Sequence, residues 1–198
     1  MSDRVPRLLS LAGIVGPAGF IGAWATSAAL TPGYSSVQEA ISELARVDAP
    51  ARAVMTGGFV CFGVAVPTYA LALRRNLRGP AWVGAAVSGV ATLGIALFPL
   101  GVSTRTDGVH NGLAALAYLS LVAAPMLAVR PLIEAGHCRA AALSAAVVAV
   151  AAGCLTATLP GPAHGLFQRS GLTLVDLWLM AGALTAFRRD QAHRSANS

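Results

Sequence analysis

Six apolar runs alternate with short polar stretches along the 198-residue chain. Each run is roughly 18–23 residues long, and about 20 residues span the hydrocarbon core of a bilayer as a helix. Lipid offers the backbone no hydrogen-bond partner, so each run should be helical. We therefore predict an all-α membrane protein: a six-transmembrane-helix bundle that forms a single integral membrane domain over residues 1–198, with a short polar tail over residues 188–198. The predicted spans lie near residues 8–30, 53–73, 81–100, 112–129, 140–159 and 170–187.

The arginines predict the orientation of these spans. All fourteen basic residues are Arg, and cytoplasmic loops of membrane proteins carry the excess of positive charge. If both termini are cytoplasmic, four arginines lie in outer loops and ten in inner segments. The outer four are Arg46, Arg52, Arg105 and Arg169, and the inner ten are Arg4, Arg7, Arg74, Arg75, Arg78, Arg130, Arg139, Arg188, Arg189 and Arg194. We therefore expect cytoplasmic N- and C-termini in a multi-pass protein of the cell (plasma) membrane.

Composition agrees with a membrane protein. Apolar residues make up 56% of the chain and charged residues only 11%, whereas a soluble domain has about 25% charged residues. The net charge of +6 does not indicate nucleic-acid binding, because the arginines form short clusters between apolar runs and no single basic face. The expected partner is the lipid bilayer, and no nucleic acid is expected.

The first outer loop predicts a short amphipathic helix over residues 36–46. Ser36 and Glu39 have the spacing of a capping box, in which each side chain binds the backbone N–H of the other residue. Apolar and charged residues then fall on opposite faces of the helix. The apolar face holds Val37, Ala40, Ile41 and Leu44, and the charged face holds Glu39, Glu43 and Arg46. We expect this helix to lie on the bilayer surface or to cover the mouth of the bundle.

The other two outer loops each place a histidine near the start of a span. Asp107 is a suitable N-cap for the fourth helix, which would make His110 its third helical residue. Pro162 suits the first position of the sixth helix, so His164 and Gln168 would lie one turn apart on one face. The partial positive charge at a helix start favours a neutral imidazole, which can bind a metal, accept a proton or hydrogen-bond a neighbour.

Because the three outer loops reach the same membrane face, we predict that their polar side chains converge on one pocket at the outer mouth of the bundle. The centre of this pocket would be formed by Glu43, Asp107, His110, His164 and Gln168. The wider predicted site adds Tyr34, Ser42 and Arg169. His110, His164 and Asp107 are candidate ligands for a divalent metal such as Zn, because nitrogen and oxygen ligands suit such an ion.

One ionisable residue, Asp176, lies inside a predicted span. A charged side chain at the centre of a bilayer costs at least about 2.5 kcal/mol, so Asp176 should face the interior of the bundle and have a partner. An ion pair with Arg169, two turns earlier, is one interpretation, and a protonated carboxyl bonded to a neighbouring helix is the other. Structural pairing is favoured over a proton relay, because no second acid lies in any span.

Several short segments resemble one known family. After the first span come Pro32-Gly33-Tyr34-Ser35 and Ala40-Ile41-Ser42-Glu43-Leu44, the fourth span starts with His110-Asn111-Gly112-Leu113, and the sixth starts with His164-Gly165-Leu166-Phe167-Gln168-Arg169. Together with the order of the six spans, these segments resemble the prokaryotic six-helix integral membrane family catalogued as domain of unknown function 998. The resemblance covers nearly the whole chain. It implies a six-helix membrane fold with the shared residues on the outer side, and it implies no activity.

Three functions are compatible with this pattern. A binding or structural protein would use the outer loops to cap the bundle and to recognise a lipid or a membrane-protein partner, and this interpretation is favoured. A membrane-embedded, metal-assisted hydrolase acting on a lipid would use the three candidate ligands, with Glu43 or Ser42 completing the chemistry. A small transporter would need polar groups or broken helices near the midplane, where only Asp176 and the prolines qualify.

Overall fold

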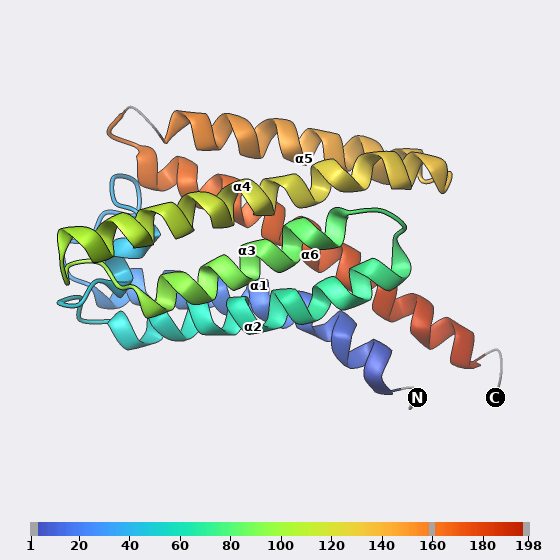
Figure 1. The fold of residues 1–198 in the computed structure, drawn as a ribbon, viewed down its shortest axis with the longest axis horizontal. Coiled ribbons are helices and arrows are strands. Elements are labelled where there is room, and N and C mark those ends of the chain that lie inside the picture. Colours follow the sequence, from blue (N-terminus) through green and yellow to red (C-terminus); the bar gives the residue numbers. More distant parts are fainter. Residues whose placement is uncertain (1–3, 159–160, 196–198) are drawn as a thin grey trace.

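The computed structural model describes residues 4–158 and 161–195, which form six α-helices and one short 3-10 helix (Figure 1). The elements are α1 (Arg4–Leu30), η1 (Ile41–Ala45), α2 (Arg52–Asn76), α3 (Ala81–Leu97), α4 (Thr104–Glu134), α5 (Cys138–Ala157) and α6 (His164–Ser195). The prediction of an all-α fold is confirmed. Residue 159 of the fifth predicted span and residues 1–3 and 196–198 of the predicted domain lie outside the described residues.

The helices form an up-and-down bundle in which consecutive helices pack against each other. α6 packs against both α1 and α5, and it also contacts α2 and α4, so the last helix lies between the first helices and the later ones. Figure 1 shows that α1 begins and α6 ends at the same end of the bundle. We call this the termini end, and we call the opposite end, where η1 lies, the plug end.

Five of the helices are long and apolar enough to cross a membrane, namely α1 from Arg7 onward, α2, α4, α5 and the 164–189 part of α6. The protein is therefore a multi-pass membrane protein. α3 is also apolar but has 17 residues, about 25 Å at a rise of about 1.5 Å per residue. The predicted run over residues 81–100 is helical only to Leu97, because Pro99 disfavours a helical backbone at the preceding Phe98.

The helix starts differ from two sequence predictions. Ser103, not Asp107, caps α4, because its hydroxyl accepts a hydrogen bond from the backbone N–H of Thr106 at 3.2 Å. α4 therefore begins two turns before the predicted span, and His110 lies in its second turn instead of its first. α6 begins at His164, two residues after the predicted start at Pro162.

Small residues allow the helix backbones to approach closely. A Cβ atom at Gly84 of α3 would lie 2.7 Å from the carbonyl oxygen of Ser120 in α4. A Cβ atom at Gly13 of α1 would lie 2.6 Å from the ring of Tyr69 in α2. Helices in lipid associate mainly through such close packing, since lipid tails are as apolar as the side chains.

Candidate functional site

The loop between α1 and α2 folds back into the mouth of the bundle. Its 3-10 helix, η1, buries Ile41 and Leu44 almost completely, with exposed fractions of 1% and 0%. Ser42 and Ala45 are buried as well. We call η1 the plug, because it covers the bundle core between α1, α2 and α6.

The predicted amphipathic helix over residues 36–46 is replaced by a turn followed by the plug. The backbone N–H of Ser35 donates to the Glu39 carboxylate at 2.6 Å, and the Ser35 hydroxyl accepts from the backbone N–H of Gln38 at 3.3 Å. Ser35 therefore takes the role predicted for Ser36, and the turn closes on itself before a helix can continue. Val37 is exposed, and Glu39, which was predicted to be exposed, is half-buried.

Arg169 fastens this loop to α6. Its side chain is only 5% exposed, and its Nη1 donates to the backbone carbonyls of Ser36 at 2.7 Å and Glu39 at 2.9 Å, as well as to Gly165 within α6 at 3.0 Å. Its Nη2 donates to the hydroxyl of Tyr34. Burying a cation is costly unless its donors find acceptors. Here three carbonyl oxygens and one hydroxyl accept from the two terminal nitrogens, whereas the buried Nε has no partner among the described residues.

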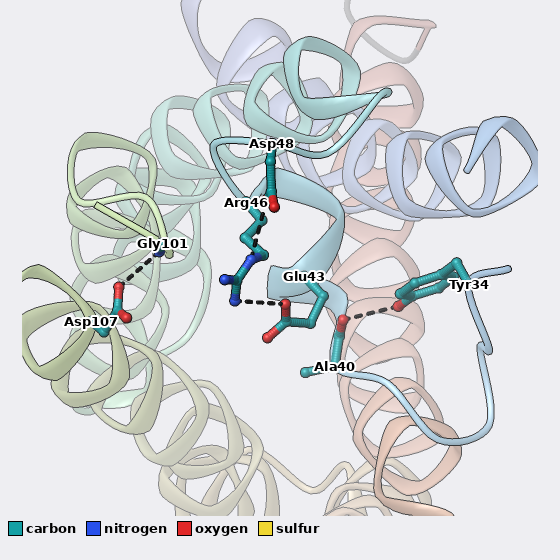
Figure 2. A network of polar contacts seen from close by, with 7 residues as sticks. All are labelled: Tyr34, Ala40, Glu43, Arg46, Asp48, Gly101 and Asp107. Atoms are coloured by element: carbon teal, nitrogen blue, oxygen red, sulfur yellow. Dashed lines mark hydrogen bonds and ion pairs between the residues drawn. The ribbon is translucent and has the colours of Figure 1, made fainter. Parts of the chain in front are cut away.

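Two aromatic rings enclose the guanidinium group. The centre of the Arg169 guanidinium lies 5.5 Å from the centroid of the Trp24 ring and 5.3 Å from that of the Tyr34 ring. Both distances are within the range of cation–π attraction, which is strongest when water is excluded. The Tyr34 hydroxyl in turn donates to the carbonyl oxygen of Ala40 at 2.9 Å, directly before the plug (Figure 2). Tyr34 thus connects α6 to the start of the plug.

Gln168 makes a second connection from α6. Its Oε1 accepts from the backbone N–H of Ile41 at 2.8 Å, and its Nε2 donates to the hydroxyl of Tyr118 in α4 at 2.6 Å. We refer to Tyr34, Gln168 and Arg169 together as the latch. Tyr118 was not predicted as part of the site, and the only sequence signal for it is a single phenol inside an otherwise apolar run.

A small cavity of about 20 Å³ lies beneath the plug. The hydroxyl-bearing residues of its wall are Ser42, Ser88, Thr92 and Tyr118. The aromatic residues of its wall include Phe20, Phe59 and Phe62, which pack with ring centroids 5.4–6.0 Å apart. This volume accommodates about one water molecule, so the plug end is filled by the side chains of the protein itself.

Glu43 points away from the latch. Its carboxylate lies 3.4 Å from Nη1 of Arg46, whose Nε is 3.2 Å from the Asp48 carboxylate (Figure 2). The attraction of Glu43 first and of Asp48 second raises the pKa of Arg46 above its ordinary value. Because these three side chains are partly or largely exposed, they form a solvated surface cluster.

Asp107 and His110 fasten the turn between α3 and α4. The Asp107 carboxylate accepts from the backbone N–H of Gly101 at 2.9 Å. His110 is 1% exposed, and its Nδ1 lies 2.7 Å from the carbonyl oxygen of Phe98. A carbonyl oxygen can only accept, so Nδ1 is the protonated nitrogen of this ring. In Figure 2 this turn lies on the opposite side of the plug from Tyr34.

The predicted central residues therefore do not form one hydrogen-bonded pocket. Among the described residues, no hydrogen bond joins any two of Glu43, Asp107, His110, His164 and Gln168. His164 begins α6 and is half-buried, and its ring makes no hydrogen bond to the residues that the structure describes. Asp107, His110 and the Oε1 of Gln168 bind backbone groups instead, whereas Glu43 pairs with the side chain of Arg46.

The three candidate metal ligands, Asp107, His110 and His164, do not form a metal site with one another. Within residues 4–158 and 161–195, no three His, Cys, Asp or Glu side chains come close enough together to hold a metal ion. Asp107 binds the α3–α4 turn, His110 binds the end of α3, and His164 lies at the start of α6.

Asp176 is fully buried in α6, and neither of its oxygens has a partner among the described residues. The suggested ion pair with Arg169 is wrong. The two residues are seven positions apart, about 10 Å along a helix, and the terminal nitrogens of Arg169 bind the first loop instead.

Comparison with known proteins identifies a family. A family model described as "Protein of unknown function (DUF998)" matches residues 14–185. Since this match includes most of α1, the plug, the latch and the membrane part of α6, the chain belongs to this family, and the resemblance noted from the sequence is confirmed. No curated protein and no solved structure matches the chain.

Proposed function

We propose that this protein is a lipid-binding, non-catalytic membrane protein with six spans, whose outer end is closed by the plug. In this proposal α3 also crosses the membrane, in addition to the five longer helices. Both termini are cytoplasmic, and the plug end faces the outside of the plasma membrane. The ligand would enter from the bilayer and not from the external water.

The distribution of arginines supports this orientation. The termini end carries Arg7, Arg74 and Arg189, together with most of the other arginines, as expected for the cytoplasmic side. The guanidinium of Arg7 lies 5.0 Å from the centroid of the Phe187 ring, and that of Arg74 lies 5.0 Å from the Trp82 ring. Arginine and aromatic side chains of this kind are typical anchors at a membrane–water boundary.

The observation that carries the proposal is the engagement of the latch. The polar side chains of Gln168 and Arg169, which were candidates for chemistry, bind backbone atoms of the first loop or a neighbouring hydroxyl. A catalytic group must be able to reach a substrate, whereas these side chains are 8% and 5% exposed and lie behind the plug. Their contacts support a structural role at the outer face.

The alternatives have less support. A metal-assisted hydrolase at the outer face needs imidazole and carboxylate ligands around one ion, and the described residues offer no such group. A transporter needs polar groups along a path through the membrane, and Asp176 is enclosed by the bundle. A membrane-protein partner that binds the outer face is compatible with the same latch.

The test is to purify the full chain in a mild detergent and analyse one preparation for both extracted lipid and bound metal by mass spectrometry. We expect about one lipid per chain to remain bound after extensive washing, and no stoichiometric metal. A preparation without retained lipid would contradict the proposal. A divalent metal at one per chain that disappears in both His110→Ala and His164→Ala would favour the hydrolase instead.

A further inference from the structure

The termini end contains a cavity larger than the one beneath the plug. Its volume is about 300 Å³, and it lies between α2, α4, α5 and α6. A volume of this size is at the lower limit of about 300–1,000 Å³ for ligand pockets. Its wall includes Tyr69, Leu73, Leu132, Leu143, Trp178 and Arg189.

Most of the cavity wall is apolar, and several of its polar atoms already have partners, whereas the hydroxyl of Tyr69 has none among the described residues. The indole Nε1 of Trp178 donates to the Ser144 hydroxyl at 2.9 Å, and this hydroxyl donates to the carbonyl oxygen of Ala140 at 2.9 Å. The side chain of Thr185 donates to the carbonyl oxygen of Ala181 at 2.8 Å. An alkyl chain could therefore occupy the cavity without leaving these groups unsatisfied.

The mouth of the cavity carries a positive charge. Nη2 of Arg189 lies 3.0 Å from Nε2 of His137, and Nδ1 of His137 lies 2.7 Å from the carbonyl oxygen of Ala135. Since guanidinium nitrogens only donate and carbonyl oxygens only accept, His137 carries its proton on Nδ1 and accepts through Nε2. The imidazole is therefore neutral in this arrangement, and the positive charge at the mouth is that of Arg189, which is exposed.

We propose that this cavity binds one acyl chain of an anionic phospholipid from the cytoplasmic leaflet, with the lipid phosphate at Arg189, whose guanidinium has further N–H donors besides the one that His137 accepts. The inference rests on the proposed function, namely that the chain binds a lipid, and it adds the place and the charge of that lipid. An arginine presents several N–H donors in a planar fork that matches the oxygens of a phosphate. Basic pockets between helices on the cytoplasmic side are suited to anionic head groups.

The charge is tested with two matched substitutions. Purified protein freed of lipid is mixed with vesicles of equal parts phosphatidylglycerol and phosphatidylcholine, recovered, and analysed for the lipid that it retains. We expect the wild type to retain phosphatidylglycerol preferentially and Arg189→Gln to lose about tenfold in this preference, the loss of one charge-assisted contact. Arg188→Gln, which removes the neighbouring exposed charge but no wall residue of the cavity, should retain the preference.

The cavity itself is tested with a second pair. Ala140→Phe places a ring in the wall of the cavity and should abolish retention of both lipids. Ala142→Phe makes the same change two residues later, at an exposed position of α5 that does not line the cavity, and should leave retention unchanged. Thermal unfolding of each variant identifies any that fail to fold, and the two pairs test the site independently.

The outcomes separate the two proposals. If the wild type retains lipid and both Arg189→Gln and Ala140→Phe retain it equally well, the cavity inference is overturned. Lipid binding at another surface then stands. Equal retention of the two lipids by the wild type, with loss in Ala140→Phe, would overturn the role of Arg189 in selecting charge. If the wild type retains neither lipid, the proposed function fails together with the inference.

Discussion

Arg169 and Arg189 lie on the same helix, about 30 Å apart at a rise of about 1.5 Å per residue, and their surroundings differ in every respect. Arg169 is 5% exposed, donates to three carbonyl oxygens and a hydroxyl, and lies near two aromatic rings. Arg189 is exposed at a cavity mouth and donates to a neutral imidazole. The first guanidinium is enclosed by its own chain, and the second is open to a ligand.

The difference shows why residue type alone does not assign a function to a polar residue in a membrane protein. What separates the two arginines is the number of backbone acceptors that the neighbouring loop supplies: the first loop supplies the Ser36 and Glu39 carbonyls to Arg169, whereas the short turn between α4 and α5 supplies only the ring of His137 to Arg189. A binding role requires donors that the fold leaves available.

The largest effect is expected when the enclosed arginine is changed. Arg169→Gln removes the charge, leaves the Ser36 carbonyl without its donor and leaves the Glu39 carbonyl with the Tyr34 hydroxyl alone, at a cost of about 3 kcal/mol in the free energy of unfolding. Arg189→Gln is the matched control and should leave the free energy of unfolding unchanged. Unfolding in detergent followed by circular dichroism measures both. Equal stability of the two variants would remove the contrast between the two ends of the bundle.

A smaller loss is expected for the second member of the latch. Gln168→Leu leaves the backbone N–H of Ile41 and the hydroxyl of Tyr118 without their partner, which should cost about 2 kcal/mol of unfolding free energy. Gln38→Leu serves as the control, because Gln38 is exposed and lies in the loop between α1 and α2 that also holds Ile41. The same unfolding measurement applies, and a loss of similar size in Gln38→Leu would show that loop polarity, not the latch, determines stability.

The α3–α4 turn should respond less than the latch. Asp107→Ala removes the acceptor of the Gly101 backbone N–H, a partly exposed hydrogen bond, and should lower the unfolding free energy by about 0.5–1 kcal/mol. Arg105→Ala, two residues earlier and exposed, should have no effect. A loss above that of Gln168→Leu would indicate that this turn, and not the latch, holds the plug end together.

The smallest effect is expected at the surface cluster. Glu43→Gln removes one of the two acidic partners of Arg46, and the pair is exposed, so its attraction is screened by water and salt. Stability and lipid retention should therefore equal those of the wild type. If Glu43→Gln abolished lipid retention while the protein stayed folded, Glu43 would belong to a binding site at the plug end, and the closure of that end by the plug would be contradicted.

The helices could be predicted from the sequence, because the backbone N–H and C=O groups of a long apolar run in lipid can be satisfied only by hydrogen bonds within a helix. The exact ends were less predictable. Asp107 was predicted to cap α4, whereas the structure uses Ser103. Pro99 ended α3 three residues before its apolar run ended. Such choices depend on a single hydrogen bond or a single proline, whereas the spans depend on some twenty residues each.

The latch could be predicted only in part. Tyr34, Gln168 and Arg169 were identified as site residues from their polarity at the ends of spans, but their partners were not. Most of those partners are backbone atoms, such as the Ser36 carbonyl and the Ile41 N–H, and every residue type offers the same backbone atoms. Sequence therefore shows which side chains need partners, while the fold decides which backbone groups they find.

The latch also sets an order of events during synthesis. Its hydrogen bonds join loop residues to a side chain 130–135 positions later in the chain. At about 5–20 residues per second, the first loop waits roughly 7–27 s before the ribosome has made Arg169. During that interval the Ser36 and Glu39 carbonyls depend on water, and the plug is not fastened. A chain interrupted before α6 would therefore lack both side chains of α6 that fasten the plug.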